Sequence, residues 1–449
     1  MLLKNIANAF VRLEYGNKVL VCDPWVTPGI FDGGWAPFPP VQDPRSALAN
    51  ATHCFISHIH EDHWDAGALE MLPRSTVMFV PDIYPNHVIR SKLLSAGFTH
   101  VVMLTPGKPE QAFEGVSVEA VAPMNGFAQE EELYRSDHSM QMVAAVDAGA
   151  IVTSDEAKLV LLSDNSPYFL EDAGDSLERM RNADLLAFPF NSLADDFPVC
   201  YDDMSLEEKR RTSLARNRKR VDLQAPNIKA LAPRAIMPYS SDFVVQGPRS
   251  EEFVAVHPRQ FVDKAQAAAL YSEATGCDAV VLYEGDDLKI AYGQLELRRG
   301  GVDRPDIAEV AARLKKSRPA PADRFAPRLD FEGLLHDIER AAANMWSRCD
   351  NYDLHTDWSL VLEISDHQRS VTLDFAQRRV MESRGDEEKA LTCVINSGHL
   401  QSHLDFKSHW NNSMIGHHLS WRRFPQEFDL MLYRALNFFH LPLTPQRSV

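Results

Sequence analysis

The sequence predicts an α/β protein in which a large first part is followed by a smaller α+β part. Strand and helix patterns alternate over residues 1–298, an order that is typical of α/β folds. Two breaker segments follow at 298–305 and 317–322, rich in glycine, proline and basic residues. The 449 residues also exceed one ordinary domain. We therefore predict a first domain at 1–298, a linker at 299–326 and an α+β domain at 327–449.

The composition is that of a globular protein without a membrane anchor. Hydrophobic residues make up 45% of the chain, yet no apolar run reaches the length of a membrane span. The first residues begin a strand pattern and not a signal peptide, so a cytoplasmic protein is expected. The net charge of −17 argues against nucleic acid as a substrate. Six scattered cysteines predict reduced thiols and no disulfide framework.

The chain opens with a hairpin and an unusual loop. Residues 5–22 alternate in the β manner around a Gly-Asn turn. Residues 23–40 hold so many prolines and glycines that we predict no regular structure there. The loop also carries large aromatic side chains, which either pack as a structural plug or line a substrate channel: Trp25, Phe31, Trp35 and Phe38. Further strands are predicted at 76–81, 101–104 and 116–121, with a helix at 86–96.

Four metal-binding side chains follow a short strand predicted at residues 52–57. Residues 57–64 read Ser-His-Ile-His-Glu-Asp-His-Trp. Because side chains alternate along a strand, His58 and His60 lie on one side and can bind one ion. The adjacent Asp62 and His63 face different ways unless the chain turns, and a helix predicted over 64–72 makes that turn, so two neighbouring metals could be bound. Imidazole with carboxylate suits zinc or iron better than calcium or magnesium.

The spacing His-x-His-x-Asp-His resembles the signature of the metallo-β-lactamase superfamily. This resemblance implies an αβ/βα sandwich, in which two β-sheets pack between helices and one or two metals lie at the sheet edges. The fold alone does not decide the reaction, since it serves hydrolases, nucleases and oxygen-using enzymes.

Two further candidate ligands lie downstream. His138 stands at the entrance of an apolar strand predicted at 140–146, about where the superfamily has its third histidine. Asp164 follows the strand at 158–162, where the superfamily carries a bridging aspartate. The resemblance therefore implies two divalent ions, iron or zinc, the first held by His58, His60 and His138, the second by Asp62 and His63, with Asp164 as the bridge.

The position of the family's last histidine is different here. Tyr239 stands there, after the strand 235–238. The second site could therefore be completed by water, by Tyr239 or Asp242, or by a carboxylate from elsewhere. Asp202 and Asp203 are candidates for that carboxylate, because they lie in an irregular segment. Their alternative role is to cap the next helix, but the sequence Ser-Leu-Glu-Glu that begins at Ser205 already forms a capping box.

The helix that begins there is basic in an otherwise acidic chain. A solvated face is the ordinary interpretation of such a run. The alternative is a dock for an anionic substrate tail, such as that of a phosphate-bearing carrier or a nucleotide. The basic residues are Lys209, Arg210, Arg211, Arg216, Arg218, Lys219 and Arg220.

A closer resemblance covers residues 20–260. The segments Asp23-Pro24-Trp25, 197–201 and 237–239, followed by Val256-His257-Pro258, resemble the metal-binding part of CMP-N-acetylneuraminate hydroxylases. The Cys-x-His and Cys-x-x-His pairs of a Rieske cluster are missing from this sequence. The hydroxylase reaction is therefore not expected to carry over.

The second part alternates helices and strands in the α+β manner. Strands at 279–283 and 289–292 close the first part. Residues 392–399, with Trp410-Asn411-Asn412 and Gly416, faintly resemble a sterol-carrier domain. Five histidines are expected at a polar surface or an interface: His399, His403, His409, His417 and His418. Later elements are predicted as helices at 307–316, 331–348 and 428–439 and strands at 359–364 and 370–375.

These observations predict a dinuclear metal-dependent hydrolase. A metal-bound hydroxide would attack the carbonyl of an ester, an amide or a thioester, an acyl-coenzyme A among them. The alternative is a diiron enzyme that uses dioxygen on the same ligands. The expected partner is a small or coenzyme A-linked substrate, with no nucleic acid and no membrane, and a homodimer remains open.

Overall fold

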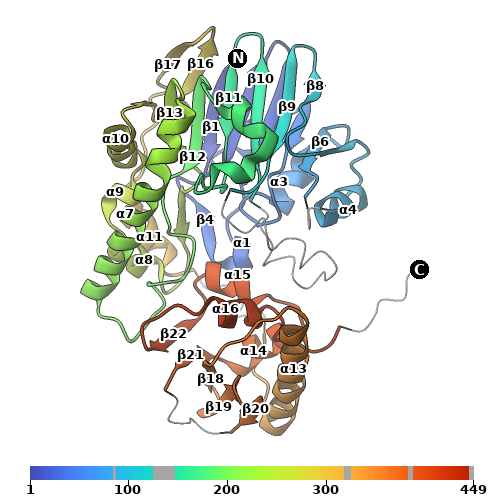
Figure 1. The fold of residues 1–449 in the computed structure, drawn as a ribbon, viewed down its shortest axis with the longest axis vertical. Coiled ribbons are helices and arrows are strands. Elements are labelled where there is room, and N and C mark those ends of the chain that lie inside the picture. Colours follow the sequence, from blue (N-terminus) through green and yellow to red (C-terminus); the bar gives the residue numbers. More distant parts are fainter. Residues whose placement is uncertain (84–86, 125–146, 318–324, 383–387, 444–449) are drawn as a thin grey trace.

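The computed structural model describes residues 1–83, 87–124, 147–317, 325–382 and 388–443. Two large sheets face each other in the first part, and a smaller sheet lies below them in Figure 1. The first sheet has the order β17 (Gln294–Arg298), β16 (Asp287–Ala291), β1 (Leu2–Ala7), β2 (Phe10–Tyr15), β3 (Lys18–Cys22), β5 (His53–Phe55), β6 (Val77–Pro81) and β7 (Val101–Leu104).

The second sheet lies against the first. Its order is β15 (Asp278–Ala279), β13 (Ala235–Tyr239), β12 (Leu185–Pro189), β11 (Lys158–Leu161), β10 (Gly149–Ser154), β9 (Val116–Val121) and β8 (Glu110–Phe113). Strands β11, β12, β13 and β15 run parallel, and all residues of β12 and β13 are buried. This is the pattern of strands that are covered on both faces.

Three apolar layers hold the first part together. Between the sheets, Leu13 and Phe55 of the first sheet share one cluster with Leu159 and Met237 of the second. The outer face of the first sheet is covered by α2 (Pro44–Leu48), α3 (Ala66–Met71) and α4 (His87–Ser95). The outer face of the second sheet is covered by α6 (Leu177–Met180), α7 (Leu206–Leu231) and α10 (Lys264–Thr275). The first part is therefore the αβ/βα sandwich that the sequence predicted.

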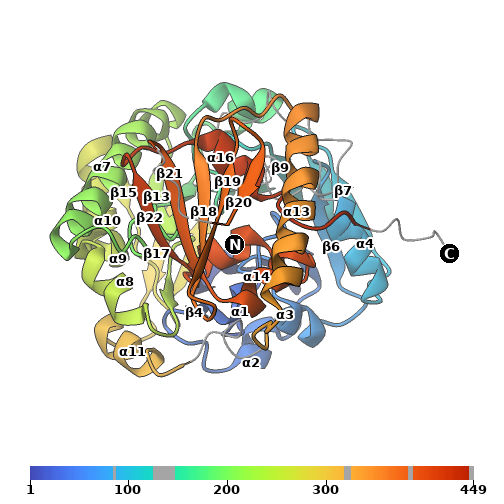
Figure 2. The ribbon, with the colours of Figure 1, turned by 90° about the horizontal axis from the view of Figure 1, so that it is seen from below.

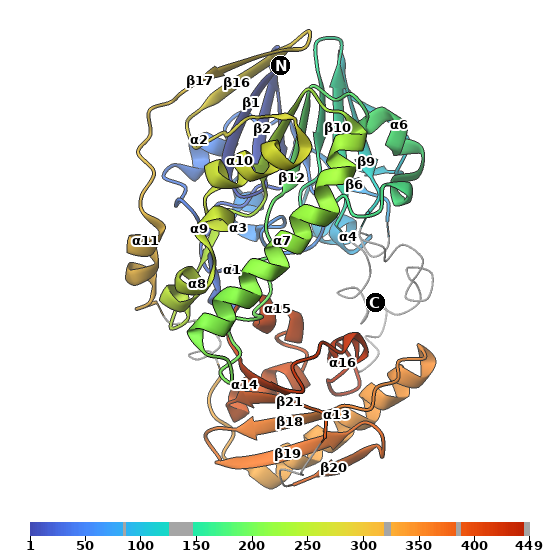
Figure 3. The same cartoon turned by 60° about the vertical axis from the view of Figure 1, so that its left-hand side comes forward.

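Helix α7 begins where the sequence predicted it. The side chain of Ser205 accepts from the backbone N–H of Glu208, and the Glu208 carboxylate accepts from the backbone N–H of Ser205. Figure 3 shows α7 running along the outside of the second sheet toward the C-terminal part. Smaller elements complete this side, namely η3 (Leu170–Ser176), α8 (Ser250–Val256) and α9 (Arg259–Val262).

The loop at residues 23–40 contains regular structure, contrary to prediction. It holds the short turn α1 (Ile30–Gly33) and the strand β4 (Trp35–Pro37), which pairs antiparallel with β14 (Phe243–Val245). Glycines with positive φ at 29 and 33 allow the tight turn that brings β4 back to Gly29. The four aromatic side chains of the loop are buried, which supports the structural plug over the channel lining.

The C-terminal part is built on a five-stranded sheet. Its order is β20 (Arg379–Met381), β19 (Arg369–Asp374), β18 (Ser359–Ile364), β21 (Ala390–Ile395) and β22 (Ser420–Phe424). Helix α13 (Phe331–Asn351) packs along this sheet, as seen from below in Figure 2. Helices α14 (Ser397–Leu404), α15 (Trp410–Ile415) and α16 (Leu430–Leu436) complete this part, whereas α11 (Ile307–Leu314) packs against β4 and β14 of the first part.

The two parts share one apolar cluster. Trp25, Trp35 and Leu193 of the first part belong to the same cluster as Leu360 and Trp421 of the C-terminal sheet. The backbone N–H of Trp421 also bonds to the carbonyl of Cys200 at 2.7 Å. Because one cluster spans both parts, the structure does not separate them at a boundary, and the domain boundaries drawn from the sequence stay a prediction. Among the described helices, none combines the length and the apolar character that a membrane crossing requires.

Candidate metal centre

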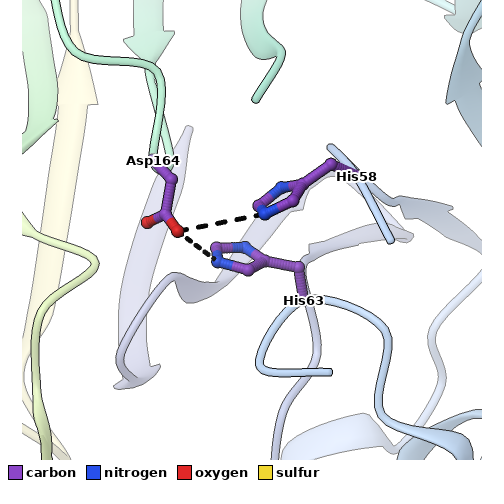
Figure 4. Close-up of side chains that lie close together, drawn as sticks. All are labelled: His58, His63 and Asp164. Atoms are coloured by element: carbon purple, nitrogen blue, oxygen red, sulfur yellow. Dashed lines mark hydrogen bonds and ion pairs between the residues drawn. The ribbon is translucent and has the colours of Figure 1, made fainter. Parts of the chain in front are cut away.

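The histidine motif lies where the two sheets meet. Strand β5 ends at Phe55 and β11 ends at Leu161, so the segments that carry His58 and Asp164 both leave their sheets at this edge. Figure 4 shows the side chains of His58, His63 and Asp164 pointing toward one another. The predicted helix after the motif begins at Ala66, where the side chain of Asp65 accepts from the N–H of Gly67.

Three donor atoms converge in this cluster. The Asp164 Oδ2 atom lies 3.1 Å from His63 Nε2 and 3.9 Å from His58 Nε2. All three atoms lie within 4.8 Å of one another. Donors at about 2.0–2.1 Å from one tetrahedral ion would lie about 3.3–3.4 Å apart. The spacing and the donor types therefore fit a zinc or iron ion.

A second group overlaps the first. The His58 Nε2 atom lies 2.8 Å from His60 Nδ1 and 3.6 Å from Asp147 Oδ1. His58, His60 and Asp147 also meet the spacing of a metal site. Asp147 was not predicted, although a carboxylate just before the buried strand β10 was a signal that could have found it.

The charges of the cluster favour a bound cation. Burial lowers the pKa of His58 well below its usual value, which keeps a lone pair available on a neutral ring. Burial alone would raise the pKa of Asp164, but the neighbouring His63 holds it well below the usual range. Burial and the nearby Asp164 raise the pKa of Asp147 to about 7. Several carboxylates thus share a buried space, and a divalent cation would neutralise them.

His63 responds to the same carboxylates. Burial opposes protonation of this ring, but Asp62, Asp164 and Asp23 raise its pKa well above the usual value. Its Nε2 atom lies 3.2 Å from Asp62 Oδ2. A protonated imidazole here takes the place of the positive charge that a metal would provide.

A second layer of hydrogen bonds orients these side chains. The Ser163 hydroxyl donates to Asp23 Oδ2 at 2.6 Å, and Asp23 Oδ2 lies 3.2 Å from His63 Nδ1. The Ser240 hydroxyl donates to Asp164 Oδ1 at 2.5 Å, which leaves Oδ2 facing the histidines. Such partners fix the rotamers of metal ligands. Asp23 and Ser240 were not assigned this role from the sequence.

The structure brings five of the six predicted ligands together, and His138 lies outside the described residues. Whether a metal binds them stays a prediction. The five side chains are His58, His60, Asp62, His63 and Asp164.

Tyr239 makes a hydrogen bond in the interior, which differs from the ligand role that was predicted at its position. Its hydroxyl accepts the backbone N–H of Ser163 at 2.6 Å, and the side chain is 2% exposed. Burial and Asp23 raise the pKa of this phenol well above its usual value, so it stays neutral. Asp242, the other candidate at this position, is held by Lys264 and Arg304.

Asp202 and Asp203 lie elsewhere, which corrects the prediction that they could complete the second metal site or take part in catalysis there. Asp202 Oδ1 accepts from Arg249 at 2.7 Å, and Asp203 Oδ2 accepts the backbone N–H of Arg423 at 2.9 Å. In the described part of the chain, neither carboxylate contacts the histidine cluster. Asp203 thus binds the C-terminal sheet directly, and Arg249, which binds Asp202, also donates to the hydroxyl of Ser420 in β22 at 2.8 Å.

The five C-terminal histidines are largely buried, so the surface location predicted for them is wrong. His399 and His403 both contact the hydroxyl of Ser413, at 2.8 and 3.1 Å. His418 lies at the contact between the two parts, because its Nε2 atom bonds to the carbonyl of Phe31 at 2.7 Å. This agrees with the alternative prediction, an interface.

Much of the basic run on α7 is paired within the protein. Lys209 is buried against Glu252, and Arg220 donates to Ser192. Arg210 donates to the carbonyl of Ala255, and Arg216 contacts Asp195 and the carbonyl of Phe197. The basic side chains of this run that are exposed are Arg211, Arg218 and Lys219.

A cleft of about 610 Å³ opens beside the centre. One wall comes from the motif through His60, Glu61 and Trp64, and the facing wall comes from Phe406, His409 and Asn412. The Glu61 carboxylate joins the two walls, since it accepts from the N–H of Phe31 at 2.5 Å and from the side-chain amide of Asn412 at 3.1 Å. The C-terminal part therefore contributes directly to the cleft at the centre.

The comparisons with known sequences give partial matches. No protein-family model matches the chain. The chain is 30% identical over 145 residues to a protein of Mycolicibacterium smegmatis described as a Rieske 2Fe-2S iron-sulfur protein, covering 30% of this chain and 28% of that one. It is 32% identical over 77 residues to a cytidine monophosphate-N-acetylneuraminic acid hydroxylase of Asterias rubens, covering 17% of this chain and 11% of the other. The chain thus spans less than a third of the length of these curated relatives.

Solved structures give matches at low sequence identity. A metal-dependent hydrolase from Veillonella parvula aligns with a TM-score of 0.42 and 19% identity, covering 64% of this chain and 98% of the other. CmlA, a diiron β-hydroxylase from Streptomyces venezuelae, aligns with a TM-score of 0.39 and 17% identity, covering 63% and 52%. The metallo-β-lactamase fold protein YhfI from Bacillus subtilis aligns with a TM-score of 0.38 and 12% identity, covering 64% and 98%.

The two facing sheets, their covering helices and the His-Asp cluster at their edge are the features implied by the metallo-β-lactamase resemblance. The predicted fold is therefore confirmed.

Proposed function

We propose that this chain is a metal-dependent hydrolase that adds water to the carbonyl carbon of an ester, a thioester or an amide of a small metabolite and breaks its acyl C–O, C–S or C–N bond. The observation that carries the proposal is the convergence of His58 Nε2, His63 Nε2 and Asp164 Oδ2 beside an open cleft. A divalent ion bound there would lower the pKa of water and stabilise the developing oxyanion.

The side chains around the centre prepare it for this chemistry. Ser240 holds one oxygen of Asp164, so that the other faces the two histidines. Asp23 and Ser163 hold the Nδ1 side of His63, so that its Nε2 side faces Asp164. These contacts pre-organise the donor atoms before an ion or a substrate arrives.

The cleft suits a substrate with an apolar acyl group. Trp64 and Phe406 offer apolar surface on opposite walls, and the exposed Lys92 lines the cleft as well. An acyl-coenzyme A thioester combines an apolar acyl chain with an anionic tail, and Lys92 could pair with that tail. Thioesters are therefore the first substrates to test.

The test is turnover of a panel of acyl thioesters, esters and amides by the zinc-loaded or iron-loaded protein. Replacing His60 removes a donor at the edge of the cleft, so His60→Ala should lower kcat/KM by at least about 100-fold. His336→Ala, on a histidine whose side chain is 69% exposed, is the matched control. Equal turnover by wild type and His60→Ala would contradict the proposal.

A diiron oxygenase is the second candidate. The observation that favours it is that neither of the two residues expected at the position of the family's last histidine, Tyr239 and Asp242, reaches the centre, since both are bound elsewhere. A coordination position open to dioxygen would result. Substrate-dependent oxygen uptake in the presence of a reductant would support this candidate, and elemental analysis of protein purified without added metal would separate iron from zinc.

A further inference from the structure

Asn8 connects the metal motif to a separate buried network. It lies in the turn between β1 and β2 with a φ of 43°, and its side chain is 1% exposed. Its amide nitrogen donates to Asp62 Oδ2 at 3.0 Å, and its amide oxygen accepts the backbone N–H of Asp242 at 3.1 Å. Because a carboxylate only accepts and a backbone N–H only donates, the orientation of this amide is fixed.

The turn around Asn8 is itself held in place. The backbone N–H of Ser240 and the side-chain amide of Asn5 both donate to the Asn8 carbonyl, each at 3.3 Å. Ser240 is also the residue whose hydroxyl holds Asp164. One short turn is therefore connected to two carboxylates of the centre.

Asp242 anchors the far side of the network. Its carboxylate lies 2.5 Å from Lys264 Nζ and 2.8 Å from an Arg304 nitrogen, and it is fully buried. Lys264 in turn donates to Asn5 at 2.8 Å. Two cations on one buried carboxylate form a rigid frame, because moving any member would leave a buried charge unpaired.

Arg304 extends this frame beyond the expected catalytic part. It lies in the segment that the sequence predicted as a linker, yet its guanidinium is 18% exposed and reaches Asp242. The frame therefore ties Arg304 to the metal motif.

We propose that Asn8 is a positioning residue for Asp62, anchored by Asp242, and that it sets the affinity of the second metal position. By holding Oδ2, Asn8 fixes the plane of the Asp62 carboxylate next to His63 Nε2, which lies 3.2 Å away. The inference rests on the proposed function in one respect, namely that Asp62 is a ligand of the second ion. Partners of this kind typically change metal affinity by about 10–100-fold.

The experiment must distinguish the positioning of Asp62 by Asn8 from a role of Asn8 in the turn alone. Asparagine tolerates positive φ, so Asn8 could serve only the geometry of the turn. Asn8→Gly keeps that conformation and removes only the side chain. Asn182→Gly is the matched control, because Asn182 also has a positive φ of 54° but is exposed and lies away from the motif.

The experiment measures zinc stoichiometry and affinity of the full chain by elemental analysis and chelator competition. Wild type and Asn182→Gly should bind two equivalents, whereas in Asn8→Gly the second equivalent should bind about 10–100-fold more weakly with the first unchanged. Near-UV circular dichroism of the metal-free proteins reports native packing. Should Asn8→Gly fail to fold, Asn8→Ala also removes the N–H donor, adds no charge or ligand atom, and should weaken the second equivalent likewise.

Two outcomes would overturn the inference, and they are distinguishable. Two equivalents with wild-type affinity in a folded Asn8 variant would refute the positioning role and leave the proposed function intact. One equivalent in wild type would refute the dinuclear centre and the inference together.

Discussion

Asp196 is a buried carboxylate whose protonation should affect folding. Burial and the neighbouring Asp195 raise its pKa to about 7, although the Trp421 indole donates to it at 2.5 Å. The folded state therefore binds a proton that the unfolded state has released above its ordinary pKa of about 3.9. This contribution to stability is fully present below about pH 4 and is lost as the pH rises through about 7.

Asp196→Asn should remove this part of the pH dependence, because the amide oxygen can still accept from Trp421 and carries no charge. We expect the variant to be more stable than wild type at pH 8, by up to about 4 kcal/mol, and no more stable at pH 4. Urea unfolding at several pH values between 4 and 8 measures this difference. Parallel curves for the two proteins would contradict it.

Local spacing revealed some site residues and not others. His58, His60 and Asp62 were predictable because four donors within six residues form a pattern in the sequence itself. Asp23, Asp147, Asn8 and Ser240 join the centre only when the sheets pack. Each lies next to a strand end at the same edge, but nothing local distinguishes such a residue from an ordinary turn former.

At the scale of elements, the start of α7 was predictable because its capping box is formed by residues that lie close together in the sequence. Ser205→Ala removes two of the three hydrogen bonds between Ser205 and Glu208 and should lower the free energy of unfolding by about 1 kcal/mol. Denaturant unfolding followed by far-UV circular dichroism measures the change. Thr212→Ala, in the second turn of the same helix, is the control and should be neutral or slightly stabilising. An equal loss in both variants would argue against the capping contribution.

Elements that depend on distant partners were missed. Strand β4 forms because it pairs with β14, which lies more than 200 positions later in the chain; Trp35 is opposite Val245. Strand β17 alternates exposed and half-buried residues at the edge of the first sheet, so its apolar signal is weak. The strand predicted at 279–283 is present only as Asp278–Ala279. Long-range pairing decided β4, whereas β17 pairs with the neighbouring β16 and was missed because its apolar signal is weak.

At the scale of the molecule, the two parts are joined more closely than the breaker segments suggested. Composition marks where a chain could be divided, but it does not show which surfaces are buried afterwards. The buried aromatics of residues 23–40 cover the C-terminal part, and the segment around Tyr201 pairs with β22 at Trp421. The cleft at the centre takes one wall from each part.

This arrangement predicts one cooperative unfolding transition for both parts. Trp421 is 1% exposed and belongs to the shared cluster, so Trp421→Ala should destabilise the whole molecule by about 3–5 kcal/mol. Tryptophan fluorescence and far-UV circular dichroism should then shift together along the denaturant axis. Phe428→Ala, at a side chain that is 64% exposed, should have little effect. Two separate transitions, with Trp421→Ala moving only one, would instead show that the C-terminal part beginning near residue 327 unfolds independently, as the sequence predicted.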